Sequence, residues 1–249
     1  MIDTSAFLGR WPFRFLPQQP LSVRQRPWKR SGMTQVWVSP LESVFLTDPM
    51  PCNEALAKTV RTSRFFIFVA GLNPSLATWR RDAEYCVARL RARALKLWPN
   101  YHDYSLHQPR VGELARWAQE HDVPLCIQLR MQDERNHPAI CVVPGVSAAS
   151  LAQLAKQHPG TRFLACGVYK NELAALAVAS NVWVELSFLE SGNTLSDAIQ
   201  TFDFRRLVFG SHAPLHCLQG SAKVPDDSDD VPAAALTAVR TGNARQLLG

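Results

Sequence analysis

The feature that most constrains the fold is a regular alternation of short β-like runs with amphipathic helical stretches. Eight such runs recur at intervals of roughly 20 to 35 residues, and each ends in small, polar or proline residues. They cover residues 1–3, 35–39, 65–70, 94–97, 125–129, 162–165, 182–186 and 207–209. Apolar residues at three and four spacing lie between them, as in Leu114, Trp117 and Ala118. This rhythm predicts repeated βα units and a parallel sheet.

Parallel βα units can form either an open doubly wound sheet or a closed barrel. An open doubly wound sheet usually carries a glycine-rich GxGxxG first turn, and the first turn here reads DTSAFLG. Eight units in a chain of 249 residues fit a closed barrel instead. We therefore predict an α/β fold, a (β/α)8 TIM barrel, with residues 1–249 forming a single domain.

Charge, apolar runs and cysteine spacing argue against nucleic-acid and membrane partners and indicate the cellular location. The net charge is +6, but Lys and Arg are spread along the chain without a run of five, which argues against nucleic-acid binding. No apolar run is long enough to cross a bilayer, which argues against a membrane partner. The six cysteines form no CxxC motif and no secretory signal opens the chain, so reduced thiols and a cytoplasmic location are expected.

In a parallel barrel, side chains at the carboxyl ends of strands line the site of chemistry. The fourth run supplies Lys96, followed by Tyr101 and His102 in the next loop, as candidates for binding substrate. After the fifth run, Arg130 and Arg135 are further substrate-binding candidates. The alternative for both sets is a solvated or internally paired loop.

Titratable groups at the strand ends are the acid and base candidates. A buried carboxylate needs a cation or hydrogen bonds, so the alternative for Glu185 and Asp3 is a structural salt bridge, with Lys96 or an arginine as partner. The acid and base candidates are His212, Asp133, His137, Glu185 and Asp3. Cys166 is either a nucleophile or a small buried residue, and no GxSxG motif supports a serine nucleophile.

A long loop is predicted over residues 9–27, rich in Pro, Arg and aromatics. It could fold over the barrel mouth, where Arg10 is another candidate for binding substrate. If Trp11, Phe13, Phe15 and Trp28 cover the mouth, an enzyme is favoured. If they form an outward apolar patch, a protein interface such as a homodimer is favoured.

Five segments taken in order resemble one known family over nearly the whole chain. They are IDTSAFLGRWPF, KLWPNYHDY, DERNHP, LVFGSHAP and NARQLLG. Together they resemble the amidohydrolase-2 family, TIM-barrel hydrolases and decarboxylases related to aminocarboxymuconate semialdehyde decarboxylase and the dicarboxylate lactonases. The resemblance implies a divalent metal, usually zinc or manganese, at the carboxyl face.

The metal positions implied by the resemblance hold unusual residues. The two histidines of the family's HxH fall on Ser5 and Phe7, the strand-five histidine on Gln128, the strand-six histidine on Cys166 and the strand-eight aspartate on His212. Only Cys166 and His212 could bind zinc, whereas a catalytic zinc site needs three protein ligands. We therefore expect no metal cofactor; the alternative is zinc held by these two residues with His102 or His137 as a third ligand.

Two functions remain open at this point. The first is an amidohydrolase-like hydrolase or lyase that acts without the inherited metal on a small carboxylate-bearing metabolite of the lactone or keto-acid type. Side-chain acids and bases such as His212 would then do the proton transfers, and the cations would hold the carboxylate. The second is a catalytically inactive barrel that binds a ligand or a protein partner.

Overall fold

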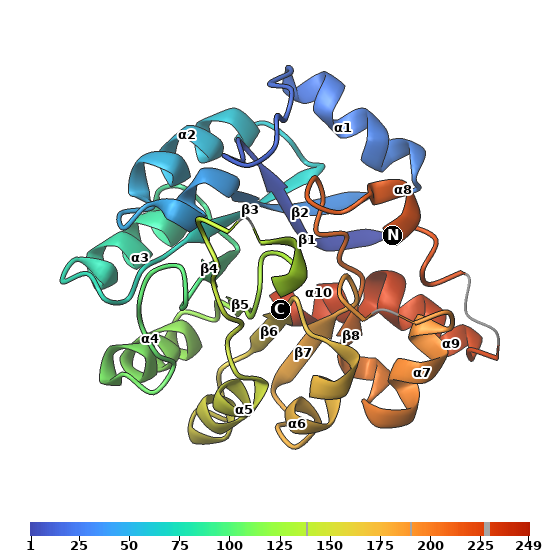
Figure 1. Cartoon of the computed structure of the whole chain (residues 1–249). Helices are drawn as coiled ribbons and strands as arrows, with labels where there is room; N and C mark the ends of the chain where they lie inside the picture. Colours follow the sequence, from blue (N-terminus) through green and yellow to red (C-terminus); the bar gives the residue numbers. More distant parts are fainter. Residues whose placement is uncertain (138, 190, 227–229) are drawn as a thin grey trace.

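Eight parallel strands form the centre of the protein in the computed structural model, which describes residues 1–137, 139–189, 191–226 and 230–249. The strands are β1 (Ile2–Leu8), β2 (Gln35–Pro40), β3 (Phe66–Gly71), β4 (Ala94–Leu97), β5 (Leu125–Gln128), β6 (Phe163–Cys166), β7 (Val182–Glu185) and β8 (Leu207–Val208). They follow one another in sequence order, each parallel to the next (Figure 1).

Backbone hydrogen bonds bring the last strand back to the first. The N–H of Thr4 donates to the carbonyl oxygen of Phe209 over 2.9 Å, and the N–H of His212 donates to that of Ser5 over 2.7 Å. The predicted (β/α)8 TIM barrel is confirmed.

Helices surround the strands (Figure 1). They are α1 (Leu21–Arg30), α2 (Met50–Val60), α3 (Trp79–Ala88), α4 (Pro109–Glu120), α5 (Ala148–Gln157), α6 (Leu173–Ala177), α7 (Thr194–Thr201), α8 (Leu218–Ser221), α9 (Ala233–Thr237) and α10 (Asn243–Leu248). Proline occupies the first turn of α2 and of α4, where its missing N–H leaves no hydrogen bond unmade. The side chain of Ser147 caps α5 by accepting from the N–H of Ser150.

Two sequence predictions need correction. The loop predicted over residues 9–27 is wrong in its second half, because α1 begins at Leu21. This helix contains Pro27 and buries only Trp28, so it lacks the apolar periodicity that marks the other helices. The first strand is longer than predicted and runs to Leu8, which places Ser5 and Phe7 on the strand itself.

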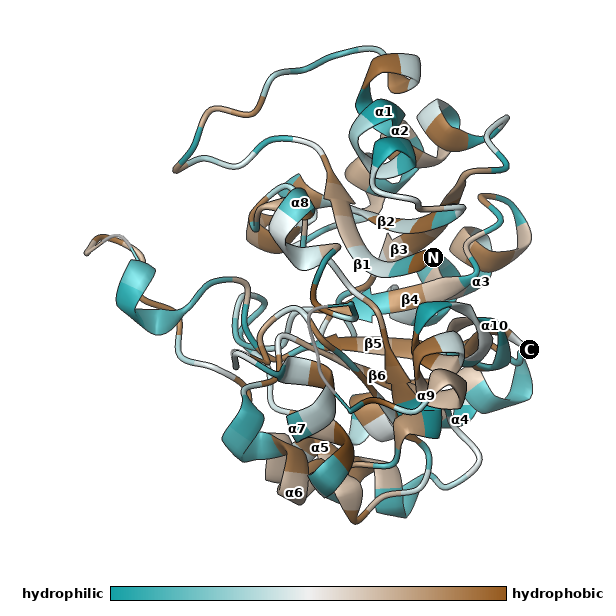
Figure 2. Cartoon of the chain, turned by 90° about the vertical axis from the view of Figure 1, so that its right-hand side faces the viewer, coloured by the Kyte–Doolittle hydropathy of each residue, from teal (hydrophilic) through white to brown (hydrophobic). Residues whose placement is uncertain are grey.

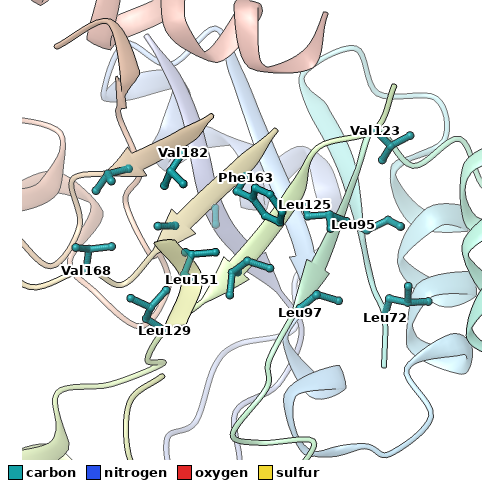
Figure 3. Close-up of a cluster of buried hydrophobic side chains, with 14 of the residues drawn as sticks. Leu72, Leu95, Leu97, Val123, Leu125, Leu129, Leu151, Phe163, Val168 and Val182 are labelled. Atoms are coloured by element: carbon teal, nitrogen blue, oxygen red, sulfur yellow. The ribbon is translucent and has the colours of Figure 1, made fainter. Parts of the chain in front are cut away.

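The apolar core has two layers, because successive residues of a strand point to opposite faces. Leu95, Leu125, Phe163 and Val182 face outward into the core beneath the helices (Figure 3). Their neighbours Ala94, Cys126, Leu164 and Trp183 belong to a separate cluster inside the barrel. Strand alternation therefore determines which residue of each strand can reach a site in the barrel.

The two ends of the barrel differ. Ala244 and Leu247 of α10 join Ile2 in the interior cluster, so α10 covers the amino end of the strands. Both chain termini lie away from α8, which follows β8 at the opposite, carboxyl end (Figure 2). None of the described helices has the length and apolar character needed to span a membrane.

Candidate functional site

A ring of interior side chains turns polar at the carboxyl ends of four adjacent strands. Successive side chains of a strand point to opposite faces, so the residue two places after an interior position also points into the barrel. In β4 to β7 these residues are Lys96, Gln128, Cys166 and Glu185. Each is at most 3% exposed. The catalytic face of a parallel barrel therefore has a buried polar floor.

Asp3 of β1 is saturated with hydrogen-bond donors. Its carboxylate accepts from the N–H of Ser211 (2.9 Å), the hydroxyl of Ser211 (2.5 Å), the N–H of Ser5 (3.2 Å) and the indole of Trp28 (2.9 Å). Burial raises its pKa, and these hydrogen bonds oppose that shift. The side chain joins β1 to the segment after β8 and to α1.

Glu185 of β7 is held in a similar way. It accepts from the N–H of Gly167 (2.7 Å) and from the N–H and hydroxyl of Ser187 (2.7 and 2.8 Å). Burial raises its pKa, whereas the hydrogen bonds and the charge of Lys96 lower it. Gly210 makes room for this carboxylate, because a Cβ there would lie 2.5 Å from Oε2.

Lys96 lies among the interior groups without a close ion pair. Its Nζ lies 4.5 Å from the ring centroid of Phe7, and in the described part of the chain no carboxylate oxygen is within 4.0 Å of it. The salt bridge expected between Lys96 and Glu185 is therefore not formed. Burial raises the pKa of the neighbouring Cys166 thiol to about 11, although Lys96 and Ser5 lower it.

His212 is wholly buried and neutral. Nε2 lies 2.7 Å from the carbonyl oxygen of Met131, so it carries the proton and Nδ1 presents a lone pair. Burial lowers the pKa of the imidazole well below its usual value, and the charges of His216 and Lys96 act in the same direction. The rings of Phe7 and Phe188 pack edge-on against it, with centroids 5.1 and 5.0 Å away.

Three buried polar atoms of the barrel interior have no hydrogen-bond partner, and neither have the indole nitrogens of Trp11 and Trp98 in the cluster that packs over it. The three are Oγ of Ser5, Oε1 of Gln128 and Nδ1 of His212. An unsatisfied buried polar group costs about 1–3 kcal/mol, so each needs an explanation. Their residues stand at three positions where the resemblance implied metal ligands.

The charged candidate residues after β5 form ion pairs and hydrogen bonds with nearby connecting segments. Arg135 pairs with Asp133 over 2.7 Å, which holds the pKa of that carboxyl far below its usual range. Arg130 binds both oxygens of Glu172 and stacks on Tyr169. In addition, Nδ1 of His137 accepts from the N–H of Val143. These contacts brace the loop, which is the alternative to a role in catalysis or substrate binding.

The remaining rim candidates lie apart from the polar floor. His102 is buried with Nε2 2.9 Å from the carbonyl oxygen of Ser43, and burial lowers its pKa. Tyr101 packs against Phe45, and burial raises the pKa of its phenol. Arg10 is exposed, and its N–H donates to Glu42.

Sequence reasoning missed a hollow beside Phe7, the residue over which Nζ of Lys96 lies. It has a volume of about 360 Å³ and lies between the connection from β1 to α1 and the connection from β8 to α8. Most of its lining is apolar, including Phe7, Leu16 and Leu218, while Arg24 and His216 supply polar groups. Apolar hollows with few polar groups are typical of small-molecule sites. We call it the β1/β8 hollow.

Arg24 is the cation of the β1/β8 hollow. It is partly buried on α1, and its guanidinium donates to Oε1 of Gln18, whereas its buried Nε has no partner. It forms no ion pair with the described carboxylates, and burial lowers its pKa against the opposing charge of Glu42. A loop was predicted over residues 9–27, so the helix that places this arginine was not expected.

Some aromatic side chains of the connection from β1 to α1, and of α1 itself, are buried, and others are exposed to solvent. Trp11 is buried in a cluster with Phe7, Trp98 and Met131, which packs over the polar floor. Trp28 is buried too, but Phe13 and Phe15 are exposed, Phe15 by 87%. Two of the four aromatics are therefore buried, as expected for an enzyme, and two are exposed, as expected for a protein interface.

The protein is therefore a (β/α)8 barrel, and its candidate site lies at the carboxyl ends of the strands. The model of a family described as Amidohydrolase matches residues 33–249, which is most of the chain. The chain belongs to this amidohydrolase family. Among curated proteins, no sequence matches it.

Solved structures similar to this chain include three decarboxylases. A 2,6-dihydroxybenzoate decarboxylase from Rhizobium is 14% identical with a TM-score of 0.73, covering 99% of this chain and 98% of its own. A dihydroxybenzoic acid decarboxylase from Polaromonas sp. JS666, with bound manganese, is 17% identical with a TM-score of 0.72 (99% and 96%). A 5-carboxyvanillate decarboxylase from Novosphingobium aromaticivorans, also with manganese, is 13% identical with a TM-score of 0.76 (99% and 96%). At these identities the likeness shows the fold.

The donor set does not fit the divalent metal implied by the family. Within the described residues, no three or more His, Cys, Asp or Glu side chains are grouped so that they could hold a metal ion. The ring of Phe7 stands at a ligand position, and Nε2 of His212 is engaged by a backbone carbonyl. Cys166 is a buried thiol, so the zinc alternative lacks a third ligand.

Proposed function

We propose that this chain is an enzyme that acts on a small carboxylic acid bound in the β1/β8 hollow, using protein groups in place of a divalent metal. The unpartnered buried atoms of Ser5, Gln128 and His212 carry this proposal. Apolar residues at these positions would avoid a cost of about 1–3 kcal/mol each. Their presence in the barrel mouth supports a polar occupant during function.

The chemistry of the hollow supports a carboxylate substrate with an apolar body. Arg24 offers a guanidinium that forms no ion pair with the described carboxylates, and a guanidinium is the group best matched to a carboxylate. The apolar lining suits the rest of the molecule. Several of the similar solved structures are decarboxylases named for dihydroxybenzoate or carboxyvanillate, which are carboxylated aromatics. Membership of the amidohydrolase family is consistent with cleavage of such a molecule.

A lactone or keto acid is the substrate type that these groups serve best. The lone pair on Nδ1 of His212 can accept a proton, and the ammonium of Lys96 can stabilise negative charge that develops nearby. A positioned general acid or base contributes about 10² to 10⁴ in rate, which is adequate for an activated substrate. The reaction is therefore a hydrolysis or a lyase cleavage.

Carboxylate binding is the first prediction. We expect benzoate, but not benzamide, to raise the thermal stability of the protein, because only the acid pairs with Arg24. Arg24→Met should weaken benzoate binding roughly 10- to 100-fold, as expected for a charge-assisted hydrogen bond. Calorimetric titration measures both.

Arg26→Met is the matched control, because Arg26 is an exposed arginine of the same helix. Its affinity for benzoate should equal that of the unaltered protein. Equal loss in both variants, or equal binding of benzamide, would contradict carboxylate recognition by Arg24.

Metal content is the second prediction. Protein purified without chelators should contain well under one equivalent of zinc or manganese by elemental analysis, because the described donors form no metal cluster. Added Mn²⁺ should leave the unfolding temperature unchanged. Stoichiometric metal that disappears in His212→Ala would overturn the metal-independent part of the proposal.

A second function is favoured by the exposed rim. Phe15 is 87% exposed and Ile140 88%, both on carboxyl-face connections. Such residues suit a non-catalytic barrel that binds a protein partner, with a homodimer as one such assembly. Concentration-dependent dimers in light scattering, together with no response to any carboxylic acid, would favour this function over the enzyme.

A further inference from the structure

Lys96 differs from every other lysine in the chain. It is 2% exposed at the end of β4, whereas all the others are exposed. As an ammonium it would lack a carboxylate within 4.0 Å in the described part of the molecule. A buried lysine without an ion pair serves no evident purpose in packing.

The surroundings of Lys96 are those of a nucleophile. An apolar cluster that includes Phe7, Trp98 and Met131 packs over the barrel mouth, and Nζ itself lies over the ring of Phe7. Lysine side chains held in apolar surroundings attack carbonyl carbons and form Schiff bases. Such a covalent intermediate needs no metal.

Proton acceptors and the β1/β8 hollow lie near Lys96. The thiol of Cys166 is a neighbour of both Lys96 and Ser5, and the charge of Lys96 acts on His212. Ser5 and His212 are two of the residues with an unpartnered buried atom. Phe7 lines the β1/β8 hollow, and Nζ of Lys96 lies over the ring of the same residue.

We propose that Lys96 forms a Schiff base with the ketone of a β-keto acid, and that the chain cleaves the acid as a lyase through this intermediate. The inference rests on the proposed function, since it assumes that a carboxylic acid binds in the hollow. It adds the substrate class, the covalent residue and the bond that breaks.

The chemistry balances with water alone. The ammonium of Lys96 first gives a proton to water; the amine then adds to the ketone carbon, and loss of water gives an iminium ion. The bond between the carboxyl carbon and its neighbour breaks, CO₂ leaves, and the iminium accepts the electron pair to become an enamine. Protonation of the enamine on carbon and hydrolysis then release the ketone and restore the amine.

Reductive trapping tests the inference. The full chain is incubated with acetoacetate and sodium borohydride, and the labelled residue is located by peptide mass spectrometry. We expect labelling of Lys96 to exceed that of Lys170 by roughly tenfold or more, because only a site that binds the keto acid concentrates the reaction. Lys96→Arg should lose this label and the release of CO₂, whereas Lys156→Arg, a change at an exposed lysine, should keep both.

Location of the label in the unaltered protein decides the matter even if Lys96→Arg folds poorly. Labelling confined to exposed lysines, or equal on all of them, would overturn the inference. If benzoate still binds through Arg24 but Lys96 takes no label, the Schiff base is wrong and the proposed function stands. If neither carboxylic acid binds, both proposals are wrong.

Discussion

Replacing Asp3 with alanine is expected to lower the free energy of unfolding by about 3–5 kcal/mol, the cost of breaking a buried, fully hydrogen-bonded charged group. Four donors would lose their acceptor: two from Ser211 and one each from Ser5 and Trp28. The three partners belong to β1, the segment after β8 and α1, so the change weakens the closure of the barrel. Urea-induced unfolding followed by tryptophan fluorescence measures the loss.

Two further variants sharpen this prediction. Asp3→Asn keeps the volume but turns an amide toward donors, so it should also destabilise the protein by several kcal/mol. Glu120→Ala, at an exposed position of α4, should change stability by less than about 0.5 kcal/mol. Asp3 would instead be catalytic if Asp3→Ala abolished turnover while leaving the unfolding midpoint intact.

The same reasoning separates the two carboxylates from the acid and base candidates. Asp3 and Glu185 each accept three or more hydrogen bonds from their own surroundings, which leaves little capacity for substrate. His212 has a free lone pair on Nδ1 in the same region. Proton transfer is therefore better assigned to the imidazole.

Strand alternation made part of the site predictable from sequence. Short apolar runs located the carboxyl ends of β4 and β7, and these ends supply Lys96 and Glu185 to the barrel interior. His212 was found from the exit of the eighth apolar run and lies four residues after Val208, the end of β8. A local rule, period two on a strand, was sufficient for Lys96 and Glu185.

Other parts of the site depend on contacts distant in sequence. Arg24 reaches the β1/β8 hollow only because α1 packs its one buried residue, Trp28, against Asp3. The tautomer of His212, with its proton on Nε2, depends on the carbonyl of Met131, which comes from the connection after β5. No periodicity in the sequence encodes such pairings, so the hollow and the protonation of His212 appear only in three dimensions.

Acid should weaken the fold through His212. Its pKa is lowered in the folded protein, so below about pH 6.5 the unfolded chain binds a proton that the folded chain does not. The stability that His212 contributes is thus complete above pH 6.5 and is lost as the pH falls toward the folded pKa. The slope approaches about 1.4 kcal/mol per pH unit below pH 6.5, so roughly 2 kcal/mol is lost between pH 6.5 and 4.5 if the folded imidazole stays neutral.

His212→Asn isolates this contribution. His212 has φ +53°, a left-handed conformation that asparagine tolerates and that most side chains do not, so the variant removes the titrating group with little backbone strain. Buried His102 also has a lowered pKa and acts with the same sign, whereas Asp3 and Glu185, with raised pKa values, lose stability as the pH rises. These groups are common to both proteins, so subtracting the two profiles of unfolding free energy against pH leaves the slope of His212. Parallel profiles would mean that the imidazole takes up its proton in the folded state, and the neutral proton acceptor assigned to the barrel mouth would be wrong.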